Sequence, residues 1–420
     1  MAIIKPFQAI RPAGEFAGKI AALPYDVYNR EEAAKIVKDN PLSFLAIDRP
    51  ETAFPPSQDM YADCVYEKAA ELLKEWIEKG YFIREEKKVY YLYELTWKGR
   101  SQCGFVAAAS IDDYENQVIL KHENTREEKE QDRIRHISYC NAQTGPIFLA
   151  YRDRERLNEI MNMVRAKEAV YDIENEDQVR HRVFLVSEES LIKEIEEQFS
   201  QIDRIYIADG HHRCASAVKV GLKRRQEDKE GKEINAEYNY FLSVLFPQSE
   251  LEILDYNRVV KDLNGYTKEE FLKLLEKNFY LEKKEEAVSP KEKGCFGMYL
   301  EGQWYQLTFK KENKEENHAV KDLDVSVLQD YCLNPILNIQ DPRIDHRIDF
   351  VGGIRGLKEL ERRVSLDCKV AFSLYPTTME ELFAVAEAKY RSAILIGKEP
   401  VARKSLIFAK VSKDGVERFV

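Results

Sequence analysis

The feature that most constrains the fold of this chain is a short stretch, residues 204–213, in which an apolar run stops abruptly at Asp209-Gly210-His211-His212-Arg213. The apolar run predicts a short buried strand, and Gly210 permits a tight turn after it. From His212 onward, apolar residues recur at helical spacing before a charged run, so we expect a helix there. The stretch therefore predicts a strand, a turn and a helix in direct succession.

This strand-turn-helix unit is suited to binding an anion. A helix that starts after a strand directs its first free N–H groups, and the positive end of its dipole, at whatever lies above the strand end. Arg213 adds a planar guanidinium that matches phosphate or carboxylate oxygens, and His211 and His212 can donate hydrogen bonds, relay a proton or bind a metal. The alternative is an ordinary turn with solvated histidines. Two adjacent histidines among only seven in the chain favour a site.

A second polar group follows an apolar segment near the N-terminus. Pro24 fixes its own backbone angle and biases the residue before it toward extended geometry, so Asp26 is expected where a strand gives way to a loop. That position suits a catalytic carboxylate. On local grounds, a role as turn residue or N-cap for the helix expected from Arg30 is equally good.

A third polar group follows the apolar residues 118–120. His122, Glu123 and Thr125 come directly after this predicted strand, and Arg126 begins a charged segment that a solvated helix would also explain. If the three groups converge, Asp26 or Glu123 supplies a carboxylate base, and the third group adds hydrogen-bond donors. We therefore predict two sets of site residues. The catalytic set is Asp26, Glu123, Asp209 and His211, and the phosphate- or nucleotide-binding set is His122, Thr125, Arg126, Gly210, His212 and Arg213.

Length and local patterns predict the domain organisation. A chain of 420 residues exceeds one comfortable core, and strands alternate with helices, so we expect an α/β or mixed α+β protein. The expected regions are residues 1–175, 176–265 and 266–420. Locally, residues 238–246 and 251–260 are predicted to pair around a turn, residues 322–328 to form a capped amphipathic helix with a structural role, and Thr377 to cap a helix.

Charge and cysteine usage exclude several classes of protein. The net charge of −10 argues against general nucleic-acid binding, which needs a positive surplus. Seven scattered cysteines without a CxxC pair predict free buried thiols in a reducing compartment. No apolar run approaches the ~20 residues of a membrane helix. We expect a cytoplasmic protein that contacts neither nucleic acid nor membrane, and the sequence indicates no oligomeric state.

The DGHHR string after an apolar strand resembles the phosphate-site motif of the ParB/sulfiredoxin-like superfamily, which includes free-serine kinases. The chain as a whole is similar to a bacterial family known as domain of unknown function 1015. The segments that carry this similarity are Lys5-Pro6-Phe7-Gln8-Ala9-Ile10-Arg11-Pro12, Leu23-Pro24-Tyr25-Asp26-Val27, Asn40-Pro41-Leu42-Ser43-Phe44-Leu45, Lys121-His122-Glu123-Asn124-Thr125, Gly145-Pro146-Ile147-Phe148 and the DGHHR itself. The family's C-terminal Met-Pro-x-Lys-Ser-Thr motif is matched only in part, so Lys404 and Ser405 receive no phosphate role.

The resemblance implies a ParB/sulfiredoxin-like core and phosphotransfer to or from a small hydroxyl compound, with L-serine or O-phosphoserine as the expected substrate of a kinase or a phosphatase. It also implies Mg²⁺ and ATP or ADP, bound without a P-loop, because no GxxxxGK[ST] occurs. Two alternatives stay open. One is a ParB-like nucleotide-binding regulator without turnover. The other is a metal-dependent phosphoesterase with His122, Asp209, His211 and His212 as ligands, although no HxH or HExxH spacing supports it.

Overall fold

The computed structural model describes residues 1–123, 125, 127–174, 178–228, 236–310, 318–342, 344–388 and 410–411. Contacts group the chain into two compact units. The first contains Met1–Lys121, Thr125–Leu251 and Lys410–Val411, and the second contains His122, Glu123 and the described residues from Glu252 to Ala388. The sequence led us to expect three regions, whereas the contacts divide the chain after Leu251. The mixed α/β class expected from the sequence is confirmed.

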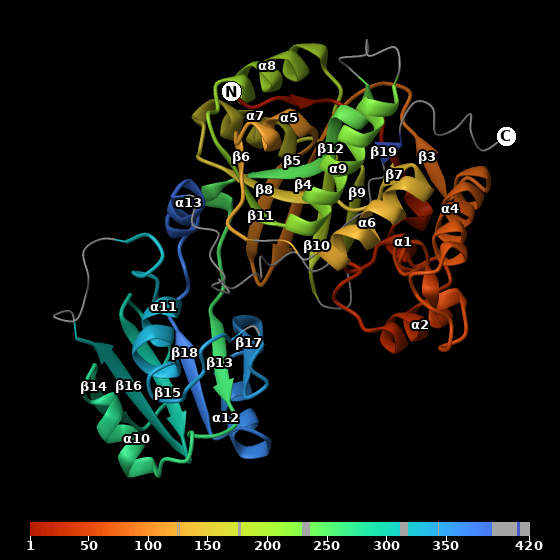
Figure 1. Ribbon diagram of the computed structural model, residues 1–420. Coiled ribbons are helices and arrows are strands. Elements are labelled where there is room, and N and C mark those ends of the chain that lie inside the picture. The colour runs from red at the N-terminus through yellow and green to blue at the C-terminus, as the bar shows by residue number, and fades with distance from the viewer. Residues whose placement is uncertain are drawn as a thin grey trace. The chain divides into compact units, whose positions relative to one another are not determined.

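The first unit is built on a nine-stranded mixed sheet (Figure 1). In spatial order its strands are β6 (Ile119–Leu120), β11 (Ile205–Asp209), β8 (Ile147–Tyr151), β12 (Tyr240–Pro247), β5 (Arg100–Ser110), β4 (Tyr90–Trp97), β10 (Arg180–Val186) and β9 (Tyr171–Glu174), with β1 (Ile4–Lys5) paired to β5. The β6–β11 and β8–β12 pairs are parallel, and the other neighbouring pairs are antiparallel. Every residue of β12 is buried, as its sequence, apolar except at Ser243, predicts for a strand with both faces covered.

Helices surround this sheet at positions that the apolar periodicity predicts well. The helices of the first unit are α1 (Ala17–Ile20), α2 (Arg30–Asp39), α3 (Leu45–Asp48), α4 (Asp63–Glu78), α5 (Ile111–Glu115), α6 (Glu127–Cys140), α7 (Glu155–Arg165), α8 (Glu189–Ser200) and α9 (His211–Glu227). Helix α4 buries an apolar stripe that includes Val65, Leu73 and Trp76. Two small sheets complete the unit, β2 (Ile10–Pro12) with β3 (Phe82–Arg84) and β7 (Ala142–Gln143) with β19 (Lys410–Val411).

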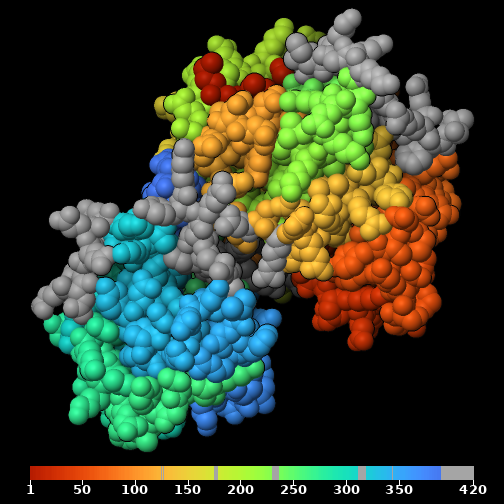
Figure 2. Space-filling view, in the orientation of Figure 1, coloured from red at the N-terminus to blue at the C-terminus, as the bar shows by residue number. Residues whose placement is uncertain are grey.

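Helices α6 and α9 lie side by side, and their surfaces adjoin in Figure 2, where α6 is yellow and α9 is green. The Ser216 hydroxyl on α9 donates a hydrogen bond to the Glu130 carbonyl on α6 at 3.1 Å. The Lys219 ammonium forms an ion pair with the Glu130 carboxylate. These contacts hold α6 against the helix that begins in the DGHHR motif.

The second unit has a six-stranded sheet of its own (Figure 1). In spatial order its strands are β14 (Phe279–Lys284), β16 (Gln303–Phe309), β15 (Cys295–Leu300), β18 (Val370–Leu374), β13 (Tyr256–Val260) and β17 (Ile348–Gly352). Its helices are α10 (Lys268–Leu275), α11 (Asp324–Leu328), α12 (Leu357–Leu366) and α13 (Met379–Glu387), with one π-helical turn at Gln329–Leu333.

The structure corrects three local predictions. Strands β12 and β13 do not pair, because β5 and β8 take both edges of β12, whereas β13 pairs with β17 and β18 in the other sheet. Helix α11 is not amphipathic, since all five of its residues are buried, and its N-cap, Leu323, offers no side-chain oxygen. The N-cap of α13 is Thr378, one residue after the one expected, and it forms a capping box with Glu381.

Two further expectations concern the cysteines and membrane contact. All seven cysteines are free, and six of them are buried. Cys64 is exposed, so the prediction of burial is wrong for that residue. None of the helices in the described part of the chain combines the length and the apolar character that a membrane crossing requires.

Candidate functional site

The strand-turn-helix unit lies in the first unit as the sequence predicts. Strand β11 runs to Asp209, and its register against β8 shifts between Ile207 and Asp209, so an irregularity lies next to the turn. Gly210 has φ +86° and ψ 31°, the left-handed conformation that glycine adopts without strain. Helix α9 then begins at His211, one residue earlier than expected. A single residue thus reverses the chain between a buried strand and a helix N-terminus.

Arg213 folds back over this turn. Its Nη1 donates to the Pro146 carbonyl at 2.6 Å, and its Nη2 donates to Asp209 Oδ2 at 3.1 Å. A Cβ placed on Gly210 would lie 3.1 Å from Nη2, and one on Gly145 would lie 3.4 Å from Nη1. Both glycines therefore provide the space that the guanidinium occupies. Arg213 ties α9 to the segment before β8, and its charge remains beside the turn.

The two histidines and Thr125 have different surroundings. His211 is buried, whereas His212 is half-buried. The Thr125 hydroxyl donates to the Glu130 carboxylate, which also pairs with Lys219. Burial opposes ionisation of Glu130, but the hydrogen bonds from Lys219 and Thr125, together with nearby His212, keep its pKa below the usual value. Thr125 and His212 thus border a buried carboxylate on α6.

Asp26 lies in an exposed turn between α1 and α2. The local alternatives for this residue were a turn role and an N-cap role. Asp26 does lie in a turn, which the Val27 N–H closes onto the Pro24 carbonyl at 3.1 Å, but Asn29 caps α2 and forms a capping box with Glu32. Among the described residues, no hydrogen bond or ion pair engages the Asp26 carboxylate. The cap is therefore satisfied without Asp26, which leaves its carboxylate available for chemistry.

Asp26 lines a cavity of about 220 Å³, which we call the first hollow. The wall includes three tyrosines, Tyr25, Tyr61 and Tyr66. Its charged residues are Asp26, Arg49, Glu51, Lys129, Asp132 and Arg133. Acidic and basic side chains are therefore equal in number, which suits a small ligand that carries charges of both signs.

Arg213 lines a smaller cavity of about 40 Å³, which we call the second hollow. Asp48, Arg133, His136 and Thr144 also line it. Tyr25 and Arg133 belong to the walls of both hollows, so the two cavities are neighbours. The structure thus brings Asp26 and Arg213, residues far apart in the sequence, to adjoining cavities of one unit.

The wall that the two hollows share is an arginine stacked on a tyrosine. The Arg133 guanidinium carbon lies 4.0 Å from the centre of the Tyr25 ring, and its Nε and Nη2 lie 2.9 and 2.8 Å from Asp132 Oδ2. Burial raises the pKa of Tyr25, Asp26 raises it further, and Arg133 and Arg213 oppose the rise. Tyr25 therefore keeps its phenolic proton at neutral pH.

The sequence reasoning did not predict a role for Tyr25, Arg133 or His136. Helix α6 buries Glu130, Arg133, His136 and Cys140, which recur at helical spacing. Polar residues thus occupy the buried face that an apolar stripe normally forms. That pattern is a sequence signal for a polar cavity, whereas from the charged segment we singled out Arg126 and left open whether the rest is a solvated helix.

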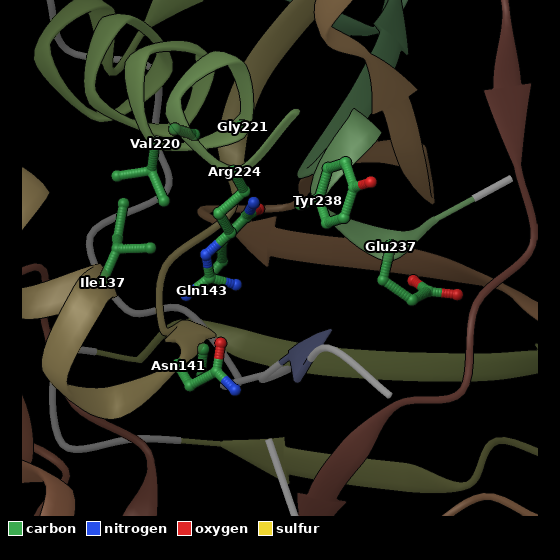
Figure 3. Close-up of a pocket in the computed structure, with 10 residues that line it drawn as sticks. Ile137, Asn141, Gln143, Val220, Gly221, Arg224, Glu237 and Tyr238 are labelled. Carbon is green, nitrogen blue, oxygen red and sulfur yellow. The ribbon is translucent and has the colours of Figure 1, made fainter. Parts of the chain in front are cut away.

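A third hollow, of about 20 Å³, adjoins the second and shares Gln143 and Ala217 with it. Figure 3 shows Arg224, from α9, and Gln143 directed toward one another, with the Tyr238 ring beside them. The Gln143 side chain donates to the Tyr240 carbonyl at 3.1 Å and accepts from the Leu242 N–H at 2.5 Å. Because the volume suits about one or two waters and Gln143 is engaged by the backbone, this hollow serves packing.

The other predicted site residues are His122, Glu123 and Arg126. His122 and Glu123 group by their contacts with the second unit. Arg126 lies outside the described residues, as do Lys404 and Ser405. Within the described ranges, no three His, Cys, Asp or Glu side chains form a group that could hold a metal ion. The phosphoesterase alternative therefore has no ligand set among those residues.

The fold and this site define a mixed α/β protein with a carboxylate and two arginines at adjoining cavities. The chain belongs to the family described as protein of unknown function (DUF1015), whose sequence model matches residues 4–326. None of the curated proteins matches the chain.

Several solved structures are similar to it. One is a free serine kinase in complex with AMP, with 15% identity, a TM-score of 0.33, and coverage of 67% of this chain and 82% of that one. A conserved hypothetical protein from Pyrococcus furiosus has 14% identity, a TM-score of 0.29 and coverage of 67% and 85%. SbnI with C-terminal truncation from Staphylococcus aureus has 11% identity, a TM-score of 0.33 and coverage of 67% and 77%.

Proposed function

We propose that this protein is a phosphotransfer enzyme that acts on a small hydroxyl amino acid, with L-serine and O-phosphoserine as the first candidates. The observation that carries the proposal is that Tyr25 and Arg133 line both the cavity of Asp26 and the cavity of Arg213. Phosphoryl transfer depends mainly on positioning and on neutralisation of the transferred group, and adjoining cavities with these charges can supply both.

In this proposal the first hollow holds the amino acid. Its paired acids and bases match an ammonium and a carboxylate, and its three tyrosines add hydroxyl groups and aromatic surface. Asp26 accepts the proton of the substrate hydroxyl as that oxygen forms its bond to phosphorus and the bond from phosphorus to the leaving oxygen breaks. Asp26 suits this role because the fold does not use it as a helix cap.

The transferred phosphoryl group lies toward the second hollow, where Arg133 and Arg213 offer positive charge. The N-terminus of α9, which follows Gly210, adds its dipole on the same side as Arg213. ATP or ADP is the implied partner in the transfer. Mg²⁺, which is usually bound through one or two carboxylates and substrate phosphates, would be held by a carboxylate of the first hollow other than Asp26, and it would neutralise phosphate charge there.

The test is an assay of two reactions with the purified full chain. Exchange of phosphate between L-serine and ATP or ADP indicates a kinase, and release of phosphate from O-phosphoserine without nucleotide indicates a phosphatase. The Arg213→Ala variant should lose about 100-fold or more in turnover, as removal of a donor to a developing charge does elsewhere.

Arg225→Ala is the matched control on the same helix. Arg225 forms a bidentate pair with Asp112 at 2.6 and 2.8 Å and lines neither hollow, so its loss should lower stability without lowering turnover per folded molecule. Full activity of Arg213→Ala would contradict the phosphate-binding role. Nucleotide binding without turnover of either amino acid would favour the regulator instead.

A further inference from the structure

We propose that the second hollow is a subsite for a tetrahedral oxyanion that still carries a proton, and that Asp48 and His136 select the protonated form. The ligand class is inorganic phosphate or a protonated phosphate monoester, as opposed to a fully deprotonated oxyanion such as sulfate. This inference deepens the proposed function by specifying the state of the phosphate, and it rests on that function only for its link to turnover.

The hollow has a cationic side. Arg133 and Arg213 both line it, and the structure engages each guanidinium in part, Arg133 by Asp132 and Arg213 by Asp209 and the Pro146 carbonyl. A guanidinium has five N–H donors, so these contacts leave donors for a ligand on both arginines. Two arginines in one small cavity favour an anion.

The same hollow has a carboxylate in its wall. The Thr144 hydroxyl donates a hydrogen bond to Asp48 Oδ1 at 2.7 Å, so its hydrogen is engaged by Asp48. Asp48 retains a second oxygen, and an ionised carboxylate can only accept hydrogen bonds. A bare oxyanion beside this carboxylate is repelled, whereas an oxyanion with a proton can donate a charge-assisted hydrogen bond to it.

His136 provides a second acceptor. Its Nε2 lies 2.9 Å from the Ile47 carbonyl, which can only accept, so Nε2 carries the hydrogen. Burial lowers the pKa of His136 and nearby Arg133 lowers it further, while Asp48, the Ile47 hydrogen bond and Asp132 oppose the change. The ring is therefore neutral at pH 7, and Nδ1 carries a lone pair. A ligand in the hollow that hydrogen-bonds to the ring must therefore donate to Nδ1.

The volume fits a single small anion. About 40 Å³ accommodates roughly three water molecules, which is near the size of one tetrahedral oxyanion. The hollow thus combines donors from Arg133 and Arg213 with acceptors on Asp48 and His136. A ligand that satisfies both sides must itself have oxygen acceptors and at least one O–H donor.

The experiment is calorimetric titration of the full chain with inorganic phosphate and, separately, with sulfate, at constant ionic strength. The wild type should bind phosphate at least about tenfold more tightly than sulfate, which is the effect of one hydrogen bond to a charged group. The preference for phosphate over sulfate should persist from pH 6 to pH 8, because inorganic phosphate keeps at least one O–H group over this range. Equal affinity for the two anions, or binding of neither, would overturn the proposal.

Asp48→Asn tests the selection directly. Asparagine keeps an oxygen for the Thr144 hydroxyl and replaces the other oxygen with a donor, so sulfate affinity should rise and the preference for phosphate should shrink to within about threefold. An unchanged preference would overturn the role of Asp48. Asp112→Asn is the matched control, because it makes the same substitution at a carboxylate of the first unit that pairs with Arg225 and does not line the hollow.

Nitrogen-15 NMR of the imidazoles tests His136 without any activity. His136→Gln identifies the signal by its loss, and the wild-type signal should show a neutral ring with hydrogen on Nε2, whose Nδ1 shifts when phosphate is added. A doubly protonated ring at pH 7 would overturn the assignment.

If phosphate is preferred over sulfate but no phosphotransfer occurs, the proposed function fails and this inference holds. If phosphotransfer occurs without a preference for phosphate over sulfate, the proposed function holds and this inference fails.

Discussion

The guanidinium carbon of Arg133 lies 4.0 Å above the Tyr25 ring, and both side chains line the first and the second hollow. A displacement of either side chain therefore changes both cavities. Arg133 comes from α6 and Tyr25 from the turn before α2, so this stack joins the helix beside α9 to the loop that carries Asp26.

The first prediction concerns the removal of Arg133. Arg133→Met deletes a buried cation and leaves the Asp132 carboxylate with the Tyr66 hydroxyl but without a positive charge beside it, so the free energy of unfolding should fall by about 2–4 kcal/mol. Phosphate binding should be lost, because both hollows lose positive charge. Urea unfolding and calorimetric titration measure the two effects. In the double variant Arg133→Met with Asp132→Asn, stability should partly recover while binding does not. Recovery of binding would show that Arg133 acts only through Asp132.

The second prediction separates the two interpretations of Asp26. Asp26→Asn should change the free energy of unfolding by no more than about 0.5 kcal/mol, because the residue is exposed and does not cap α2. Its turnover should fall by about 100-fold or more if it is the base. Asn29→Ala should do the reverse, with a loss of about 1 kcal/mol in stability and little change in turnover. A stability loss in Asp26→Asn without a kinetic effect would support the structural interpretation.

Local patterns predicted the elements of the fold well. Helix α2 begins at Arg30, as expected, and helix α9 begins one residue before the expected start, because apolar periodicity and glycine turns are local signals. Strand partnership was predicted less well. Residues 238–260 looked like one hairpin, yet β12 and β13 join different sheets, since the partners of a buried strand depend on tertiary packing that no short window contains.

Only some residues of the candidate site could be predicted from the sequence, because the burial of the others also depends on tertiary packing. Asp26 and Arg213 stand where apolar runs end, which is visible in the sequence, and the structure places them at adjoining cavities. Arg133 lies inside a charged helical segment, where its sequence neighbours resemble a solvated surface. Its burial depends on α6 packing against α9, a contact between residues 86 positions apart in the chain, so composition alone could not identify it.

The third prediction uses two glycines with left-handed backbones. Gly210→Ala should lower stability by about 1 kcal/mol through backbone strain, and its new Cβ, 3.1 Å from Arg213 Nη2, should displace the guanidinium. Anion binding should therefore weaken. Gly80→Ala is the control, because Gly80 has φ +73° and a Cβ there would meet nothing within 4 Å. Both variants should unfold at lower urea concentration, and only Gly210→Ala should bind phosphate less tightly. Equal phosphate affinity in the two variants would contradict the role assigned to the turn.

The fourth prediction concerns the dependence of stability on pH. Burial raises the pKa of Asp113 from 3.8 to about 6, although the Ile3 N–H donates to its carboxylate at 2.6 Å. Because the folded protein holds this proton more tightly than the unfolded chain, Asp113 contributes stability that is fully present below pH 3.8 and is lost as the pH rises to about 6. A shift of this size corresponds to at most about 3 kcal/mol.

Asp113→Asn should remove this loss, because the amide keeps an oxygen for Ile3 and has no charge to desolvate. Above pH 6 the variant should be more stable than the wild type, and the difference should shrink toward zero as the pH falls to about 4. The neighbouring Asp112 is the control with the opposite sign, since its hydrogen bonds from Arg225 hold its pKa below the usual value. Asp112→Asn should lower stability at neutral pH and leave most of the wild-type slope between pH 4 and 6 in place, because the Asp112 charge is a smaller cause of the raised pKa of Asp113 than burial. Urea unfolding of the three proteins across this range measures both effects, and a pH-independent difference for Asp113→Asn would show that the carboxyl keeps its ordinary pKa in the fold.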